Sequence, residues 1–342
     1  CLPAILSPID TFLLLATYTF ANFKNILALE NRQKFFWVFA GLYFFISLHL
    51  RSFSCFVARK GIFLLNLLRL ARFDKPIGIF LLLWPTLTAL WVASNQLPDI
   101  RLIIIFTAGT ILMRSAGCIA NDLADQSIDK RVKRTKNRQL VLKNITNQTA
   151  FIFLLSLLAL SFFLVLQLNI YTIYLSILAC ISALIYPFFK RFFMIPQLFL
   201  GIAFSFGILL AFAAIQNTIP LEGWLLFIAN LLWVLGYDSH YALVDLEDDK
   251  KINIYSSAKT FGKFTPIFII ISFIFMYLIY FYFGYKNEYS KLFYFFLTLS
   301  SFANLYGLYA GLKNSSDGNF KAFKINNYVG LLIFLSFFTQ IK

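Results

Sequence analysis

Long, uninterrupted apolar runs dominate the chain from residue 76 onward. Each run is about 20 residues long, which is what an α-helix needs to cross a hydrocarbon core of about 30 Å. The runs are continuously apolar rather than alternating, and this pattern favours helices over a membrane β-barrel. The sequence therefore predicts an all-α polytopic membrane protein with nine transmembrane helices. The predicted spans are 76–94, 100–121, 150–168, 170–187, 196–215, 222–241, 265–283, 291–310 and 326–341.

The first 66 residues follow a different pattern. Two apolar stretches, 9–23 and 35–50, flank a polar patch near Asn31 to Lys34. A signal peptide normally has one short apolar core preceded by charge and followed by a small-residue cleavage site, which this segment lacks. We predict a hydrophobic extension of unknown role over 1–66 and a membrane domain over 67–342.

Charge is scarce and unevenly distributed. Of 342 residues only 13% are charged, against about 25% in soluble domains. Lys and Arg gather in the loops after the second, fourth, sixth and eighth spans, for example at Lys143, Lys190, Lys259 and Lys321. By the positive-inside rule these loops are cytoplasmic, so the C-terminus lies outside. The rule accounts for the net charge of +15, and we expect contact with a lipid bilayer but no nucleic acid.

The second predicted span ends in an acidic motif. Asn121, Asp125 and Asp129 are spaced i, i+4 and i+8 in "NDLADQSID". Because an α-helix turns about 100° per residue, a continuous helix would place all three on one face. The neighbouring Asp122 points off that face, and we expect it to be solvated or to act indirectly.

A second acidic motif ends the sixth span, in "YDSHYALVDLEDD". Asp238, Asp245 and Asp249 are spaced i, i+7 and i+11, which again places them on one helix face. Asn121 is separated from Asp245 by 124 positions, and so is Asp125 from Asp249. The matched offset predicts duplication of a four-helix unit.

Carboxylates at a membrane surface next to basic residues suggest a specific chemistry. Ionisable groups near hydrocarbon are costly and usually mark function. Facing carboxylates repel unless a cation lies between them, and hard oxygen ligands suit Mg²⁺, which proteins usually hold together with substrate phosphates. The motifs therefore predict a Mg²⁺–diphosphate site, and the apolar bundle predicts a lipid-tailed diphosphate. Either motif alone would equally suit a solvated loop, and an ion-coupled transporter is the alternative class, although it would carry charges near mid-membrane.

Both motifs resemble those of a known family. "NDLADQSID" resembles the NDxxDxxxD motif of the UbiA prenyltransferase family, and "YDSHYALVDLEDD" resembles its second motif, DxxYAxxDxxxD. The segments "RFDKPIGIFLLLWPTLTALW" (72–91), "VKRTKNR" and "YPFFKR" are similar to those of the bacterial 4-hydroxybenzoate polyprenyltransferases within that family. The resemblance covers most of residues 66–342.

The resemblance implies an enzyme of ubiquinone biosynthesis in the bacterial inner membrane, with its active site on the cytoplasmic side. It would use Mg²⁺ to transfer a polyprenyl chain from polyprenyl diphosphate to 4-hydroxybenzoate, ortho to the hydroxyl, and release diphosphate. Nine helices would surround a central cavity with a lateral opening to lipid. Protein partners are not indicated.

The resemblance also implies residue roles. The implied metal ligands are Asn121, Asp125, Asp129, Asp245 and Asp249. The implied catalytic residues are Asp125, Asp129, Asp245, Asp249 and Arg191. The implied substrate-binding residues are Arg72, Asn121, Arg134, Arg138, Lys190, Asp238 and Tyr241. Within the last group we expect Arg72 to bind the benzoate carboxylate, because a guanidinium forms a fixed fork; the alternative is a membrane anchor.

Two features leave alternatives open. Gln139 stands where the family usually has Pro, a change that we expect to loosen the basic loop. The acceptor could also be haem, a naphthoate or another quinone precursor, although "DKPIGIFLLLWPTL" favours 4-hydroxybenzoate.

Overall fold

The computed structural model describes residues 62–252, 254–312 and 315–340, and it is helical throughout this part of the chain. The predicted extension over 1–66 therefore lies outside the described residues, apart from 62–66. The helices are α3 (Ile62–Leu70), α4 (Ile77–Ser94), α5 (Ile100–Ala124), α6 (Gln126–Asp129), α7 (Asn147–Val165), α8 (Ile170–Phe189), α9 (Gln197–Gln216), α10 (Leu221–Asp249), α11 (Ser257–Phe261), η1 (Gly262–Phe264), α12 (Thr265–Lys286), α13 (Lys291–Leu312) and α14 (Ser316–Phe338).

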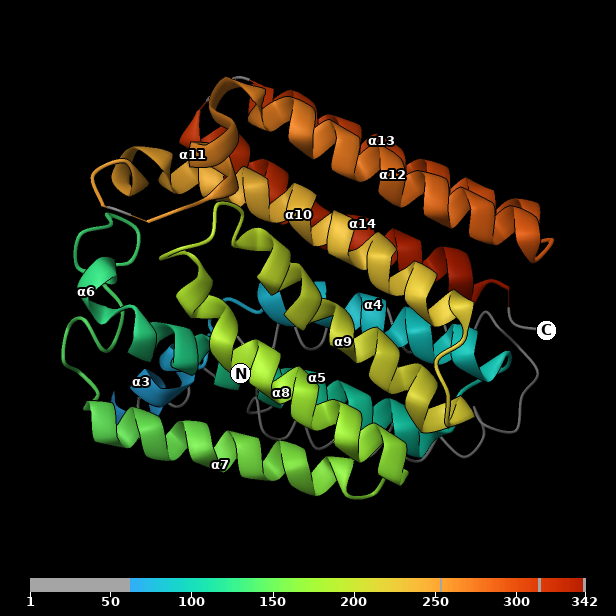
Figure 1. The fold of residues 1–342 in the computed structure, drawn as a ribbon, viewed down its shortest axis with the longest axis horizontal. Coiled ribbons are helices and arrows are strands. Elements are labelled where there is room, and N and C mark those ends of the chain that lie inside the picture. Colours follow the sequence, from blue (N-terminus) through green and yellow to red (C-terminus); the bar gives the residue numbers. More distant parts are fainter. Residues whose placement is uncertain (1–61, 253, 313–314, 341–342) are drawn as a thin grey trace, which may run out of the picture. The chain divides into compact units, whose positions relative to one another are not determined.

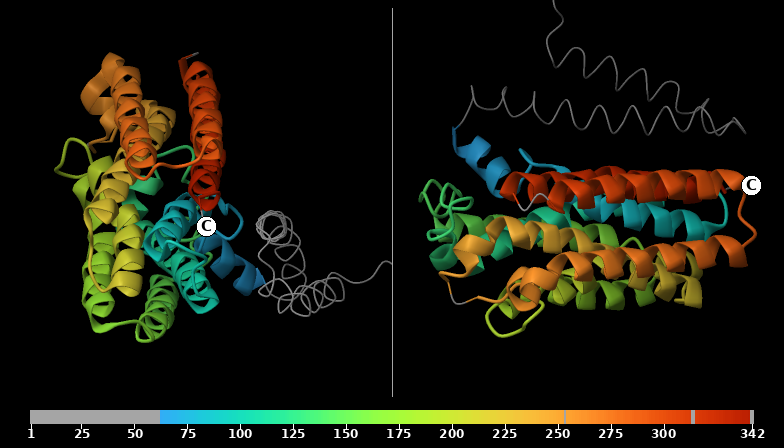
Figure 2. Two further views of the ribbon diagram at one scale, coloured as in Figure 1. Left: turned by 90° about the vertical axis from the view of Figure 1, so that its right-hand side faces the viewer. Right: turned by 90° about the horizontal axis from the view of Figure 1, so that it is seen from above.

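Among the described residues, nine long helices make up the unit from Arg69 to Lys342, and they run back and forth along one common direction (Figures 1 and 2). The most extensive contacts join α13 to α14, α10 to α9 and α12, α4 to α9, and α5 to α7. Eight of these helices are long and apolar enough to cross a membrane. The all-α, multi-pass prediction is thus confirmed for the described part of the chain.

The ninth long helix, α14, is more polar because asparagines replace apolar residues on its buried side. Trp233 Nε1 donates to Asn326 Oδ1 at 2.8 Å, and Trp84 Nε1 donates to Asn327 Oδ1 at 3.1 Å. The helix approaches both tryptophans closely, since a Cβ on Gly330 would lie 2.6 Å from the ring of Trp233. Buried polar groups are tolerated when they are paired in this way.

Two helix ends differ most from the prediction. α10 continues to Asp249, beyond the predicted end at 241, so the second acidic motif is wholly helical. α14 begins at Ser316 rather than 326, because the polar segment before its apolar part is also helical. The Ser315 hydroxyl accepts from Gly318 N at 2.9 Å and caps this start.

Candidate functional site

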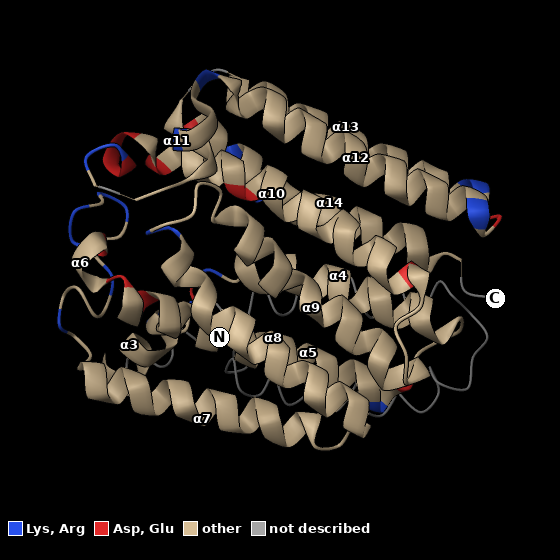
Figure 3. Ribbon diagram, in the orientation of Figure 1, with Lys and Arg blue, Asp and Glu red and all other residues tan. Residues whose placement is uncertain are grey.

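Charged residues gather at one end of the helical unit, around α6, α11 and the C-terminal ends of α5 and α10 (Figure 3). Both acidic motifs and the basic loops that follow them lie at this end, which we call the charged end. The backbone N–H of Lys133, in the loop after α6, donates to Asp248 Oδ2 at 2.8 Å, so the two motif regions touch directly.

The first motif is not one continuous helix, which corrects the prediction. α5 ends at Ala124, Asp125 adopts φ −109° and ψ 10°, and the short α6 carries Asp129. The hydrogen bond from Asp129 N to Asp125 O, at 2.8 Å, keeps the next turn nearly helical. The break turns Asp129 toward the basic loop instead of leaving it strictly above Asn121.

Asp125 is completely buried and pairs with Lys190 at the end of α8. Arg191 Nη2 donates to Ala124 O at 2.6 Å and lies 3.8 Å from Asp125 Oδ1. Burial raises the pKa of the Asp125 carboxyl, although the Lys190 ammonium acts in the opposite direction. Asp125 Oδ1 itself accepts no hydrogen bond from a described residue. The sequence-predicted residues Asp125, Lys190 and Arg191 therefore form one group.

Asp245, from the second motif, is bound by an arginine that follows the first. Arg134 Nε donates to Asp245 Oδ1 at 3.0 Å, and Arg134 Nη2 donates to Asp245 Oδ2 at 2.5 Å. The guanidinium also lies over the Tyr241 ring, 4.5 Å from its centroid. Burial alone would lower the pKa of Arg134, but the hydrogen bond to Asp245 raises it, so the side chain keeps its charge.

Asp129 and Asp122 share a third arginine. Arg138 Nη1 lies 2.6 Å from Asp129 Oδ2 and 2.9 Å from Asp122 Oδ1. Arg72 Nη2 contacts both oxygens of Asp122, at 2.9 and 2.8 Å. Arg72, which we predicted to bind a substrate carboxylate, thus already holds a carboxylate of the protein.

The remaining predicted residues lie beside this network. Asp249 is buried at the end of α10, where the charges of Asp245 and Lys190 act on it. Asn121 lies one turn before Asp125 on α5, and its side chain has no hydrogen-bond partner among the described residues. Asp238 lies deeper along α10, eleven residues before Asp249.

Gln139 does not leave the basic loop unsupported. It is buried, and its Oε1 accepts from Asn144 Nδ2 at 2.9 Å. Its carbonyl oxygen accepts from Asn144 N at 3.0 Å. These two hydrogen bonds hold the loop at the position where a proline ring would fix it.

The prediction missed Arg114, which lies in the interior of α5. Its Nε is buried without a hydrogen-bond partner among the described residues, and its guanidinium lies 5.5 Å from the centre of the Phe204 ring. Gly78 provides the space, since a Cβ there would lie 2.5 Å from Arg114 Nε. An arginine within an apolar span is itself a signal of function, and the sequence of α5 carries it at Arg114.

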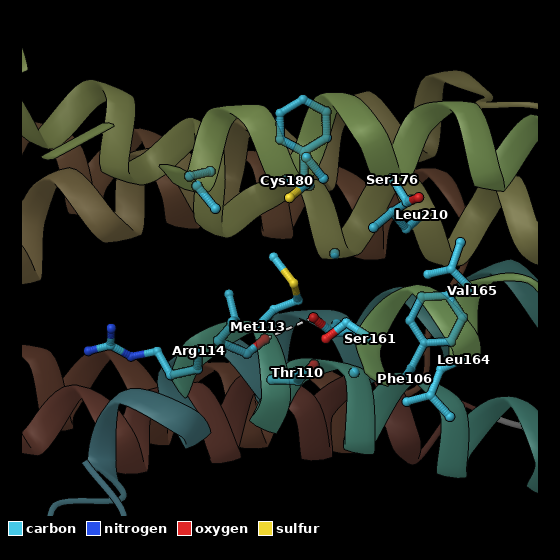
Figure 4. A pocket seen from close by; sticks show the side chains of 18 of the residues that line it. Phe106, Thr110, Met113, Arg114, Ser161, Leu164, Val165, Ser176, Cys180 and Leu210 are labelled. Atoms are coloured by element: carbon cyan, nitrogen blue, oxygen red, sulfur yellow. Dashed lines mark hydrogen bonds between the residues drawn. The ribbon is translucent and has the colours of Figure 1, made fainter. Parts of the chain in front are cut away.

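Arg114 stands at one end of an apolar cavity of about 360 Å³ (Figure 4). The cavity is lined by residues of α4, α5, α7, α8 and α9, so five helices rather than all nine form its wall. Phe162, Ile177 and Ile181 line the cavity and are also 45–48% exposed. The cavity therefore reaches the outer surface of the bundle between α7 and α8.

The oxygen donors at the charged end suit a Mg²⁺ ion that is also bound by substrate phosphates. Among the described residues no three His, Cys, Asp or Glu side chains converge as a ready metal cage. Mg²⁺, however, is commonly held by one or two carboxylates while substrate phosphates and waters complete its shell. Asp125 Oδ1 accepts no hydrogen bond from a described residue, and with Asn121 one turn earlier on α5 it supplies hard oxygen donors of the required kind.

Comparisons with known proteins agree with this geometry. The sequence profile of the UbiA prenyltransferase family matches residues 82–335. A 4-hydroxybenzoate octaprenyltransferase of Nitrosomonas eutropha is 49% identical over 267 residues, which is 78% of this chain and 93% of that protein. The protein of the same name from Tolumonas auensis is 44% identical over 266 residues, with the same coverage of 78% and 93%.

Solved structures show the same fold. A UbiA homologue from Aeropyrum pernix superposes with a TM-score of 0.67 at 23% identity, over 75% of this chain and 94% of that one. A UbiA homologue from Archaeoglobus fulgidus, bound to GPP and Mg²⁺, gives a TM-score of 0.54 at 17% identity, over 64% and 77% of the two chains.

Proposed function

The chain belongs to the UbiA prenyltransferase family, and from that premise we propose that it is a 4-hydroxybenzoate polyprenyltransferase. It transfers a polyprenyl chain from polyprenyl diphosphate to the ring carbon ortho to the hydroxyl, the step of ubiquinone biosynthesis that its motifs indicate. The observation that carries this proposal is the meeting of both acidic motifs with Lys190, Arg134 and Arg138 beside an apolar cavity.

The charged end binds the diphosphate. Mg²⁺, held by Asn121, Asp125, Asp129, Asp245 and Asp249, would neutralise the charge that develops on the leaving diphosphate. Arg134, Arg138, Lys190 and Arg191 are the cationic partners of the phosphate oxygens, since charge-assisted hydrogen bonds to phosphate are strong. The four motif aspartates and Arg191 are thus the groups that act on the reacting end of the donor.

The cavity binds the isoprenoid tail and the ring. The allylic C–O bond breaks with its electron pair leaving on diphosphate, and the ring carbon then forms the new C–C bond and loses its proton. An apolar cavity excludes water, which would otherwise capture the allylic cation. The opening beside Phe162, Ile177 and Ile181 gives a long tail access to the bilayer.

Arg114 is the better partner for the benzoate carboxylate. Arg72 is already held by Asp122, whereas Arg114 reaches the cavity with an unpartnered Nε. A carboxylate bound there would compensate a buried charge and hold the ring inside the cavity. Asp238 and Tyr241 lie near Arg114 and would shape the space around the ring.

The placement in the membrane follows from the same arrangement. Nine spans, with α14 as the ninth, put the charged end on the cytoplasmic side, where its excess of Lys and Arg belongs. The matched offset between the motifs supports duplication of a four-helix unit. A bacterial inner membrane is the location that fits a chain of this family and these relatives.

The direct test incubates membranes containing this protein with radiolabelled 4-hydroxybenzoate, octaprenyl diphosphate and either Mg²⁺ or EDTA. A lipid-soluble product is expected with Mg²⁺ and should disappear with EDTA. Folded protein that yields no such product at any donor chain length would refute the assignment. A naphthoate and a haem acceptor, assayed in parallel, would reveal a different acceptor, and solute uptake into vesicles without product would indicate a transporter.

A further inference from the structure

Asp122 differs from every other acid at the charged end because it holds two arginines from separate segments. Its carboxylate is 1% exposed and receives Arg72 from before α4 and Arg138 from the loop after α6. Arg72 has φ 63°, a left-handed conformation that is uncommon outside glycine. The fold therefore maintains an unfavourable backbone geometry at the residue that reaches this carboxylate.

Arg138 uses only one of its nitrogens in these contacts. Nη1 lies 2.9 Å from Asp122 and 2.6 Å from Asp129, while Nε and Nη2 make no hydrogen bond to any described residue. A guanidinium carries five N–H donors in a rigid fork. With Nη1 fixed by two carboxylates, the Nε–Nη2 edge is left for a third oxyanion, such as a phosphate.

Without the Asp122 carboxylate this arrangement would change in a defined way. Asp129 would be the nearest remaining anion to Arg138, and a lone carboxylate favours bidentate pairing with a guanidinium. Such a pair would occupy a second nitrogen of Arg138 and both oxygens of Asp129. The site would then lose N–H groups of Arg138 that donate hydrogen bonds to phosphate, and it would lose an Asp129 oxygen that could bind the metal.

We propose that Asp122 is a positioning residue for the diphosphate: it fixes Arg138 through Nη1, keeps the Nε–Nη2 edge free for phosphate oxygens, and links Arg72 to the site. This inference rests on the proposed function and deepens its diphosphate site. It assigns roles to Asp122 and Arg72 that do not require either side chain to touch the substrate.

The test is a double-mutant cycle on the full chain in detergent with Mg²⁺. Asp122→Asn should raise the KM for octaprenyl diphosphate about ten-fold while the KM for 4-hydroxybenzoate stays within about two-fold. In an Arg138→Met background, Asp122→Asn should cause no further rise, because both changes remove the same interaction. Calorimetric titration with inorganic pyrophosphate and Mg²⁺ should show the same pattern without turnover.

Asp248→Asn is the matched control, since Asp248 lies at the same end but accepts from the Lys133 backbone and binds no arginine. It should leave both KM values unchanged. If Asp122→Asn unfolds, Arg72→Gln replaces it, and its rise in the donor KM should likewise vanish in the Arg138→Met background.

Two outcomes would overturn the proposal. One is a rise in KM that persists undiminished in the Arg138→Met background, and the other is a fall in kcat with both KM values unchanged. The proposed function is judged separately: if the wild-type protein binds pyrophosphate and the cycle holds in calorimetry, but no 4-hydroxybenzoate is prenylated, then Asp122 keeps its role and the acceptor assignment fails.

Discussion

The arginines of the charged end and the arginine of the cavity are held in opposite ways. Arg72, Arg134 and Arg138 each contact a carboxylate within 2.9 Å. Arg114 lies 5.5 Å from the centre of the Phe204 ring, Asp238 is its acidic neighbour without a direct ion pair, and its Nε has no hydrogen-bond partner among the described residues. An arginine that is paired with a carboxylate is positioned by the protein. An arginine without such a pair inside an apolar span costs free energy to bury, and a bound ligand can supply the missing partner.

We expect the largest loss of activity when a motif aspartate at the charged end is replaced. Asp245→Asn keeps the size of the side chain but removes the charge that binds Arg134 and, in our proposal, Mg²⁺. Prenyl transfer should fall about 10³-fold, the range seen when an electrostatic catalytic group is lost. Steady-state kinetics on detergent-purified protein would measure this, with thermal unfolding to show that the bundle persists.

Glu247→Gln provides the comparison on the same helix, because Glu247 is exposed and its one ion pair among the described residues is with Lys250. It should retain wild-type rates. Equal losses in both variants would mean that general charge, rather than the Asp245 position, matters at this end.

An intermediate effect is expected in the cavity. Arg114→Met should raise the KM for 4-hydroxybenzoate by about 10- to 100-fold, the loss of one charged hydrogen bond, while the KM for the prenyl donor hardly changes. Because the change removes a buried Nε–H that has no hydrogen-bond partner among the described residues, the melting temperature should stay equal or rise. A change in donor KM alone would place Arg114 with the diphosphate, and Arg101→Met, at the exposed start of α5, is the control.

The smallest effect is expected at the side opening of the cavity. Ile181→Trp adds bulk where the cavity meets the surface, and it should raise the KM for octaprenyl diphosphate about five-fold while geranyl diphosphate is unaffected. Leu178→Trp makes the same kind of change on α8 at an exposed residue that does not line the cavity. Identical behaviour of the two variants would argue that the tail leaves elsewhere.

The prediction that each acidic motif lies on one continuous helix is confirmed for the second motif and wrong for the first. On α10 the spacing of Asp238, Asp245 and Asp249 matches one unbroken helix. On α5 the same argument failed at Asp125, where the helix ends and α6 begins. Periodicity describes an ideal helix, and it carries no information about a break that is stabilised by Lys190, a residue 65 positions away.

The sequence by itself determined that the described chain is a multi-pass helical protein and that the second motif lies on one unbroken helix, because these features depend on local hydropathy and on the helical period. Only the tertiary structure decided which cation meets which acid: Arg72 with Asp122, Lys190 with Asp125 and Arg134 with Asp245. The sequence is compatible with many other pairings between these acids and the nearby Lys and Arg residues, because an ion pair depends on the distance between two side chains in space and not along the chain. The lack of a hydrogen-bond partner for Arg114 Nε is likewise visible only in the packed helices.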